Sequence, residues 1–192
     1  MQKFPIVLDL ETQHTFREFS EPEKLKVSLV GIYNYADRRS QAFREDELAR
    51  LFPLLENASY VIGYNITSFD MPVLRPYYAG DIASFALFDI LDDIKRITGR
   101  RIGLNDVARA TFDEKKSGHG LMAIDYFKEG KWEELEKYCL DDVTLTKKVF
   151  EVGLKNGVIY GLDETGKYPI RVDWKHYMED NGSTNMPLTL PF

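Results

Sequence analysis

An apolar stretch that ends in two acids lies near the N-terminus: Phe4-Pro5-Ile6-Val7-Leu8-Asp9-Leu10-Glu11-Thr12. Residues 4–10 are apolar and rich in β-formers, which predicts a buried strand. Side chains alternate along a strand, so Asp9 and Glu11 point to the same face, roughly 6.6 Å apart along the chain. Two anions at the end of a buried strand are costly unless a cation lies between them. A solvated strand end is the alternative that this triplet alone leaves open.

The rest of the chain continues as a meander and then as alternating helices and strands. Strands are expected at residues 26–35, 40–44, 59–64 and 85–89, and helices at residues 45–56, 68–78, 89–98, 105–112 and 132–156. A hairpin of residues 158–160 and 168–172 follows the long helix, which Gly157 ends. This order predicts an α/β fold with antiparallel and parallel strand pairs. We expect a main domain of residues 1–157, with residues 158–192 packed on it as a hairpin and tail.

The composition describes one folded, acidic chain. Its 192 residues include 25 basic and 31 acidic ones, a formal net charge of −6, and 44% are hydrophobic. The acid excess argues against a protein that coats nucleic acid, but it allows an enzyme that grips phosphates through metal ions. Cys139 is the only cysteine, which excludes an internal disulfide and fits a reducing compartment. The early acids argue against a signal peptide, and residues 57–69, the longest uncharged stretch, are too short to span a bilayer. We therefore expect a cytoplasmic protein without a membrane segment.

A second acidic motif follows the fourth expected strand: Gly63-Tyr64-Asn65-Ile66-Thr67-Ser68-Phe69-Asp70. The strand ends, a polar loop follows, and Asp70 lies near the start of the next helix. Ser68 or Asp70 acting only as a helix cap is the simpler interpretation of this segment by itself.

A third motif lies within the long helix: Tyr138-Cys139-Leu140-Asp141-Asp142. Tyr138 and Asp142 are four residues apart and share one face of the helix. An ordinary amphipathic helix with exposed acids explains the segment equally well. Asp141, three residues after Tyr138, is a rival to Asp142 for any role on that face.

Taken together and in this order, the three motifs resemble the DEDD superfamily of 3′–5′ exonucleases. Its motifs are Asp-x-Glu, then Asn followed by Phe-Asp, and finally Tyr-x-x-x-Asp in the tyrosine subgroup. The subgroup includes the proofreading domains of family B DNA polymerases and stand-alone predicted exonucleases. The histidine subgroup has His five residues before the last Asp, where this chain has Lys137. The resemblance covers about residues 4–150. It implies a ribonuclease-H-like fold, with a five-stranded mixed sheet whose second strand is antiparallel, flanked by helices.

The resemblance also implies a function and a site. The function is metal-dependent 3′–5′ hydrolysis of single-stranded nucleic acid, with DNA favoured over RNA and a role in replication or repair. Carboxylates are the ligands that Mg²⁺ or Mn²⁺ prefers, and four of them balance two such ions. By resemblance, Asp9 bridges both ions and Tyr138 orients the attacking water. The implied metal ligands are Asp9, Glu11, Asp70 and Asp142, the fifth catalytic residue is Tyr138, and the implied substrate-binding residues are Leu10, Thr12, Asn65 and Phe69.

Two other functions use the same residues. The chain could be a non-catalytic module of this fold that binds nucleic acid or a replication partner. It could also be a Mg²⁺-dependent hydrolase of small nucleotides, which predicts a closed pocket rather than an open groove. A basic run, Lys95, Arg96, Arg100 and Arg101, is a candidate contact for a nucleic-acid backbone, and solvated helix ends explain it as well.

The C-terminal tail raises a separate question. Residues 187–192, Pro-Leu-Thr-Leu-Pro-Phe, are similar to the short terminal peptides that bind bacterial sliding clamps. Such peptides usually begin with Gln, and Pro187 stands in that place here. Docking of Leu188, Leu190 and Phe192 on the protein's own core is the interpretation that we favour.

Overall fold

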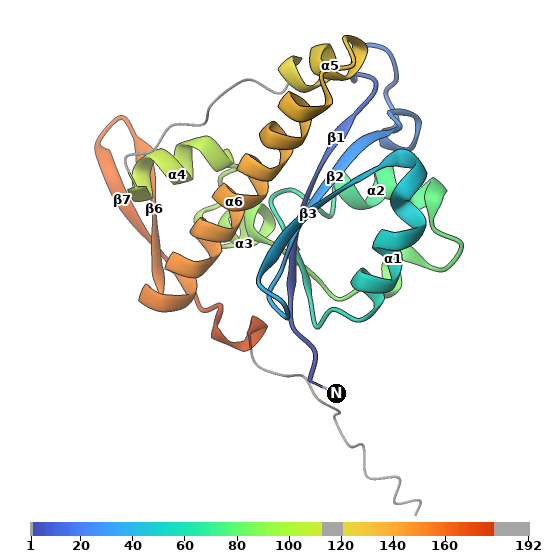
Figure 1. Cartoon of the computed structure of the whole chain (residues 1–192). Coiled ribbons are helices and arrows are strands. Elements are labelled where there is room, and N and C mark those ends of the chain that lie inside the picture. Colours follow the sequence, from blue (N-terminus) through green and yellow to red (C-terminus); the bar gives the residue numbers. More distant parts are fainter. Residues whose placement is uncertain (1, 113–120, 179–192) are drawn as a thin grey trace, which may run out of the picture.

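The computed structural model describes residues 2–112 and 121–178. A five-stranded sheet forms its centre, in the order β3-β2-β1-β4-β5 (Figure 1). The strands are β1 (Ile6–Thr12), β2 (Val27–Asn34), β3 (Arg39–Arg44), β4 (Val61–Gly63) and β5 (Leu87–Asp89). Strand β2 pairs antiparallel with β1 and β3, while β1, β4 and β5 run parallel. The expected mixed sheet with an antiparallel second strand is confirmed.

Helices cover both faces of this sheet (Figure 1). The α-helices are α1 (Leu48–Glu56), α2 (Asp70–Leu74), α3 (Ile90–Thr98), α4 (Leu104–Phe112), α5 (Leu121–Lys128) and α6 (Trp132–Asn156). The 3-10 turns are η1 (Pro22–Lys24), η2 (Glu45–Glu47), η3 (Arg75–Tyr77), η4 (Ile82–Ser84) and η5 (Lys175–Tyr177). The apolar residues of β1 alternate between the two faces, because successive side chains of a strand point to opposite sides. Ile6, Leu8 and Leu10 pack with α1 and α2, whereas Val7 packs with α3, α4 and α6.

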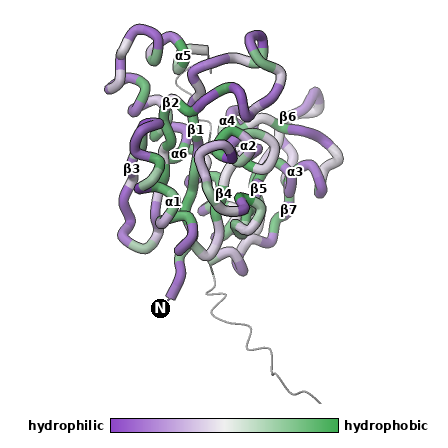
Figure 2. The backbone as a smooth tube through the Cα atoms, turned by 90° about the vertical axis from the view of Figure 1, so that its right-hand side faces the viewer, coloured by the Kyte–Doolittle hydropathy of each residue, from purple (hydrophilic) through white to green (hydrophobic). Residues whose placement is uncertain are grey.

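The two cores agree with the hydropathy of the chain. In Figure 2 most of the hydrophobic stretches, β1 among them, lie in the middle of the molecule, and hydrophilic segments surround them. Val7 and Ile62 from neighbouring strands are fully buried against Val143 and Phe150 of α6. Burial of such a side chain contributes roughly 1.5–3 kcal/mol, so this contact holds the long helix on the sheet.

A C-terminal hairpin packs beside the second core. Strands β6 (Val158–Asp163) and β7 (Gly166–Arg171) pair antiparallel in a separate sheet, and Trp174 follows them. The Trp174 ring lies on Gly153 of α6, where a Cβ atom would come within 2.2 Å of it. The indole Nε1 donates a hydrogen bond to Asp93 at 2.8 Å. These contacts join the segment after residue 157 to the layer formed by α3 and α6.

The sequence analysis missed one helix. α5 lies directly before the long helix, and its apolar residues occur as consecutive runs rather than at helical spacing, so no period marked it. The expected helix at residues 68–78 is divided into α2 and η3. The prediction for residues 187–192 falls outside the described residues. Within residues 2–112 and 121–178, no helix combines the length and the apolar character needed to cross a bilayer.

Candidate active site

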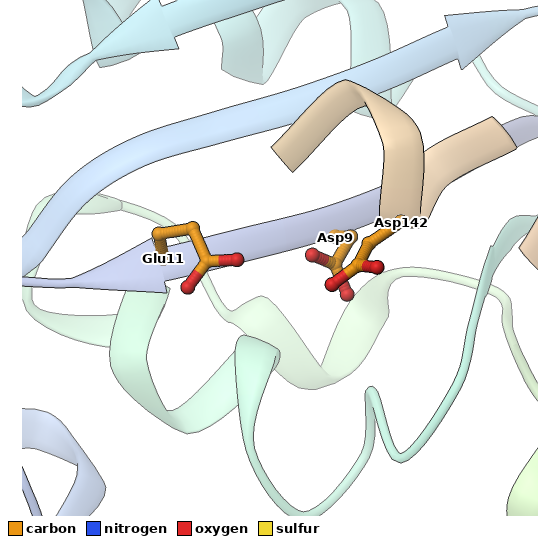
Figure 3. Close-up of side chains that lie close together, drawn as sticks. All are labelled: Asp9, Glu11 and Asp142. Carbon is orange, nitrogen blue, oxygen red and sulfur yellow. The ribbon is translucent and has the colours of Figure 1, made fainter. Parts of the chain in front are cut away.

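Three carboxylates from two distant parts of the chain converge above the sheet. Asp9 and Glu11 come from β1, and Asp142 comes from α6 (Figure 3). One oxygen from each carboxylate lies within 4.8 Å of the other two. Asp142 is only 5% exposed, and the two β1 acids are half-buried. The strand alternation that was expected to place Asp9 and Glu11 on one face is therefore present.

A glycine lets α6 approach the sheet closely enough to complete this trio. Gly31 of β2 is the register partner of Asp9. A Cβ atom at Gly31 would lie 2.9 Å from the Cys139 sulfur and 3.0 Å from a methyl carbon of Val143. The Cys139 thiol also lies 3.6 Å from the backbone oxygen of Asp9. The missing side chain at residue 31 thus sets the height of Asp142 above β1.

The two neighbouring acids of α6 have different surroundings. Asp142 joins the trio, whereas Asp141 forms an ion pair with Lys137 at 2.5 Å on the outside of the helix. Adjacent residues on a helix point about 100° apart, so only one of the two can face β1. The geometry favours Asp142 over its rival.

Tyr138 lies on the buried side of α6. Its side chain is 6% exposed and packs in a small apolar cluster with Leu29, Leu135 and Cys139. Ala123 of α5 belongs to the same cluster. The helix that the sequence analysis missed therefore helps to enclose the tyrosine, whose role in orienting water stays a prediction.

Asp70 lies beside β1 rather than within the trio. Its Oδ1 accepts a hydrogen bond of 3.1 Å from the backbone N–H of Leu10, between the two acids of the strand. Strand β4 ends at Gly63, so this carboxylate takes a position next to β1 that a longer β4 would have filled. The Leu10 side chain itself is buried in the core on the α1 face. The substrate-binding role expected of Leu10 is not tested by these contacts.

Thr12 and Phe69 line a mostly apolar hollow. The hollow has a volume of about 310 Å³, and the residues that line it are Thr12, His14, Thr15, Phe16, Arg17, Leu25, Phe69 and Ile124. The Phe16 ring is 56% exposed and lies 5.8 Å from the Phe69 ring. Two of its lining residues, Thr12 and Phe69, are the sequence neighbours of Glu11 and Asp70.

Asn65 lies in a loop that a further carboxylate holds. Its backbone has φ +68°, a left-handed conformation, and its side-chain oxygen accepts a hydrogen bond of 2.8 Å from Arg101. The loop N–H groups of Asn65 and Thr67 both donate to Asp89, at 2.9 and 3.0 Å. The sequence analysis did not select Asp89 as a site residue. Its place where the fifth strand meets the next helix was the available signal.

With this geometry established, comparison with known proteins identifies the family. A family model described as the RNase_H superfamily matches residues 6–153. The chain belongs to the RNase_H superfamily. No curated protein sequence matches the chain significantly. The ribonuclease-H-like fold expected from the three motifs is confirmed.

Two solved structures share the fold of this RNase_H superfamily chain. The first is the family B DNA polymerase from the hyperthermophilic archaeon Pyrobaculum calidifontis, with a TM-score of 0.60 and 19% identity over 78% of this chain. The second is the zinc-bound E. coli ExoI–ssDNA complex, with a TM-score of 0.50 and 14% identity over 81% of this chain. The matches cover only 24% and 41% of those two chains. At such identities the likeness concerns the fold.

The trio fits a divalent cation. Two oxygens bound to one Mg²⁺ at about 2.0–2.1 Å lie about 3–4.2 Å apart, and the three carboxylate oxygens are already within 4.8 Å of one another. The Cys139 thiol lies close to these charges. Burial, together with the negative charges of the three acids, raises the pKa of this thiol well above its usual value. Hard oxygen donors crowded in this way suit Mg²⁺ or Mn²⁺.

Because Asp70 is buried, its titration makes the stability of the folded state depend on pH. Removal from water, together with the nearby charge of Asp89, raises the pKa of Asp70 to about 7. In the unfolded chain the pKa returns to about 3.9, so between these values the folded state binds the extra proton. The contribution of Asp70 to stability is therefore greatest at low pH and is lost as the pH rises from about 4 to 7.

Asp70→Asn removes this dependence and retains an acceptor for the Leu10 N–H. In divalent-free buffer we expect the variant to gain stability over the wild type as the pH rises from 4 to 7, by on the order of a few kcal/mol. Urea unfolding of both proteins at several pH values measures the difference. A difference that does not change with pH would show that Asp70 titrates normally.

Proposed function

We propose that this chain is a metal-dependent 3′–5′ exonuclease. It would hydrolyse the terminal phosphodiester bond of single-stranded nucleic acid, with DNA favoured over RNA, by a two-metal-ion mechanism with Mg²⁺ or Mn²⁺. The observation that carries the proposal is the convergence of Asp9, Glu11 and Asp142 within 4.8 Å on the sheet of an RNase_H superfamily fold. We propose a cytoplasmic location as well.

The ligands and the chemistry of the metal follow from the donor set. Asp9, Glu11 and Asp142 would hold the ions, with Asp70 beside them as the fourth carboxylate. When bound, two such ions supply a water of lowered pKa, stabilisation of the leaving oxygen and neutralisation of phosphate charge. The residues would position the reactants, because β1 and α6 bring three carboxylates together and α2 holds the fourth beside β1.

Other residues would bind and orient the reactants. Tyr138 would hold the attacking water through its hydroxyl, since a phenol with a pKa near 10 is a poor base at neutral pH. Thr12, Phe69 and the backbone around Leu10 would bind the terminal nucleotide. The apolar hollow beside Thr12 and Phe69 supports this assignment, because an unpaired base can stack on an exposed aromatic side chain.

The comparisons support a nuclease of this kind. The ExoI structure is described as a complex with single-stranded DNA, and the other relative in fold is a DNA polymerase. Because the chain spans less than half of either protein, activity and substrate are proposed from the site. Binding of a sliding clamp through residues 187–192 stays a prediction on a segment outside the described residues.

A degradation assay tests the function directly. We expect 3′-labelled single strands to release mononucleotides, and 5′-labelled strands to shorten stepwise, with Mg²⁺ or Mn²⁺ and not with EDTA. DNA and RNA, each single- and double-stranded, provide the comparison. Binding of the strands without release of nucleotides would support the non-catalytic module. Hydrolysis of free nucleotides, with the strands left intact, would support the small-nucleotide hydrolase. Either result would contradict the proposed exonuclease.

A further inference from the structure

The loop of residues 65–67 is fixed by two residues outside the three motifs. We propose that Asp89 and Arg101 are positioning residues: they place the Asn65 amide and, through the loop, the Asp70 carboxylate beside the acidic trio. This inference rests on the proposed exonuclease function. It concerns how the second motif is held, and neither Asp89 nor Arg101 needs to touch the reacting atoms.

Asp89 joins two segments that are distant in sequence. Its Oδ1 caps α3 by accepting from the N–H groups of Leu91 at 3.0 Å and Asp92 at 3.4 Å. The same oxygen accepts from Asn65, and Oδ2 accepts from Thr67. The Asp89 side chain is 8% exposed, so water cannot readily replace these bonds. A cap alone needs one short acceptor such as Ser, whereas Asp89 uses both oxygens and also holds the N–H groups of Asn65 and Thr67.

The loop held in this way is tightly built. Asn65 adopts its left-handed conformation where non-glycine residues are uncommon, and Asn tolerates it best. Ile66 is fully buried and turns back over Gly63, where a Cβ atom would lie 2.7 Å from it. A backbone that bends so sharply needs hydrogen-bond acceptors for its N–H groups to keep this conformation. Asp89 accepts from two of these groups.

Arg101 sets the direction of the Asn65 amide. Its guanidinium donates to the Asn65 Oδ1 at 2.8 Å, which leaves the Nδ2 of the amide as a donor. An N–H₂ donor at this place suits a phosphate or sugar oxygen of the substrate. The exposed Arg101 adds positive charge beside it.

The loop passes its position on to Asp70. The Phe69 N–H donates to the backbone oxygen of Asn65 at 3.1 Å, and the Met71 N–H donates to the backbone oxygen of Ile66 at 3.0 Å. Asp70 lies between these two anchored residues and reaches the Leu10 N–H of β1. A displacement of the loop would therefore move a carboxylate of the site.

Asp89→Ser retains a single acceptor for the cap of α3 and removes the Oδ2 that accepts from the Thr67 N–H. We expect kcat/KM to fall on the order of 100-fold, mainly through kcat, as a displacement of about 1 Å can produce. The amide of residue 67 should lose protection in hydrogen exchange, while those of α3 keep it. Asp81→Ser, at an exposed cap with no loop contact, is the matched control and should keep wild-type activity.

Two further variants cover the possibility that Asp89→Ser folds poorly. Asp89→Asn keeps one acceptor oxygen, and we expect an intermediate loss of about tenfold. Arg101→Ala should raise KM about tenfold with little change in kcat, because the Asn65 amide is no longer oriented. Arg109→Ala, another exposed arginine that pairs within its own helix, is the control for lost charge.

The outcomes separate this inference from the proposed function. Wild-type protein that degrades no nucleic acid would overturn the exonuclease proposal and the role in hydrolysis with it. An active wild type whose Asp89→Ser and Arg101→Ala variants keep kcat and KM within twofold would overturn the positioning inference alone. Unchanged exchange protection at residue 67 in Asp89→Ser would do so as well.

Discussion

Replacing Asp142 by Asn is expected to lower nucleotide release by about 1,000-fold or more. The variant keeps the size of the side chain but removes a charge from the trio that would hold the ions. Loss of several kcal/mol of charge stabilisation in the transition state corresponds to such a factor, since 1.36 kcal/mol is tenfold. The measurement is the rate of release from an end-labelled single strand at saturating Mg²⁺ or Mn²⁺.

Asp141→Asn is the matched control for this prediction. It changes the adjacent residue of α6, whose carboxylate pairs with Lys137, and should retain wild-type activity. In EDTA the Asp142→Asn variant should melt at or above the temperature of the wild type, because repulsion within the trio is reduced. Added Mn²⁺ should raise the melting temperature of the wild type more than that of the variant. Full activity in Asp142→Asn would remove the assigned site.

Gly31→Ala is expected to disturb both folding and activity. The added Cβ meets the Cys139 sulfur at 2.9 Å and a Val143 methyl at 3.0 Å, so these side chains, or α6 with them, must shift. Overpacking of this kind costs about 1–3 kcal/mol, which lowers the melting temperature by several degrees for a chain of this length. Because α6 carries Asp142, activity should fall at least tenfold beyond the effect on stability.

Two companion variants identify the cause of that loss. Gly103→Ala adds the same atom where the nearest neighbour is 3.7 Å away, and its stability should stay within about 0.5 kcal/mol of the wild type. Cys139→Ala combined with Gly31→Ala removes the sulfur from the contact and should restore part of both activity and stability. If Gly31→Ala behaves like Gly103→Ala, the close approach of α6 does not control the site.

Local patterns in the sequence were sufficient for most of the elements. The apolar run at residues 4–10 gave the central strand, and the spacing of its two acids gave their shared face. The order of the three motifs led to the fold that the family match confirms. α5 and the division of α2 from η3 were missed, because short helices take their stability from packing rather than from their own sequence.

The sequence by itself determined which acids are present, on which element each lies, and which face of β1 carries Asp9 and Glu11, since these follow from the fixed periods of strand and helix. The motif spacing favoured Asp142 over Asp141, and only the tertiary structure showed that Asp142 meets them, that Asp70 bonds to Leu10 at the side of the trio, and that Asp89 holds the loop before it. Those relations depend on how closely α6 packs on Gly31 and how sharply the chain bends after β4. They arise from contacts between residues far apart in sequence, which no local period encodes.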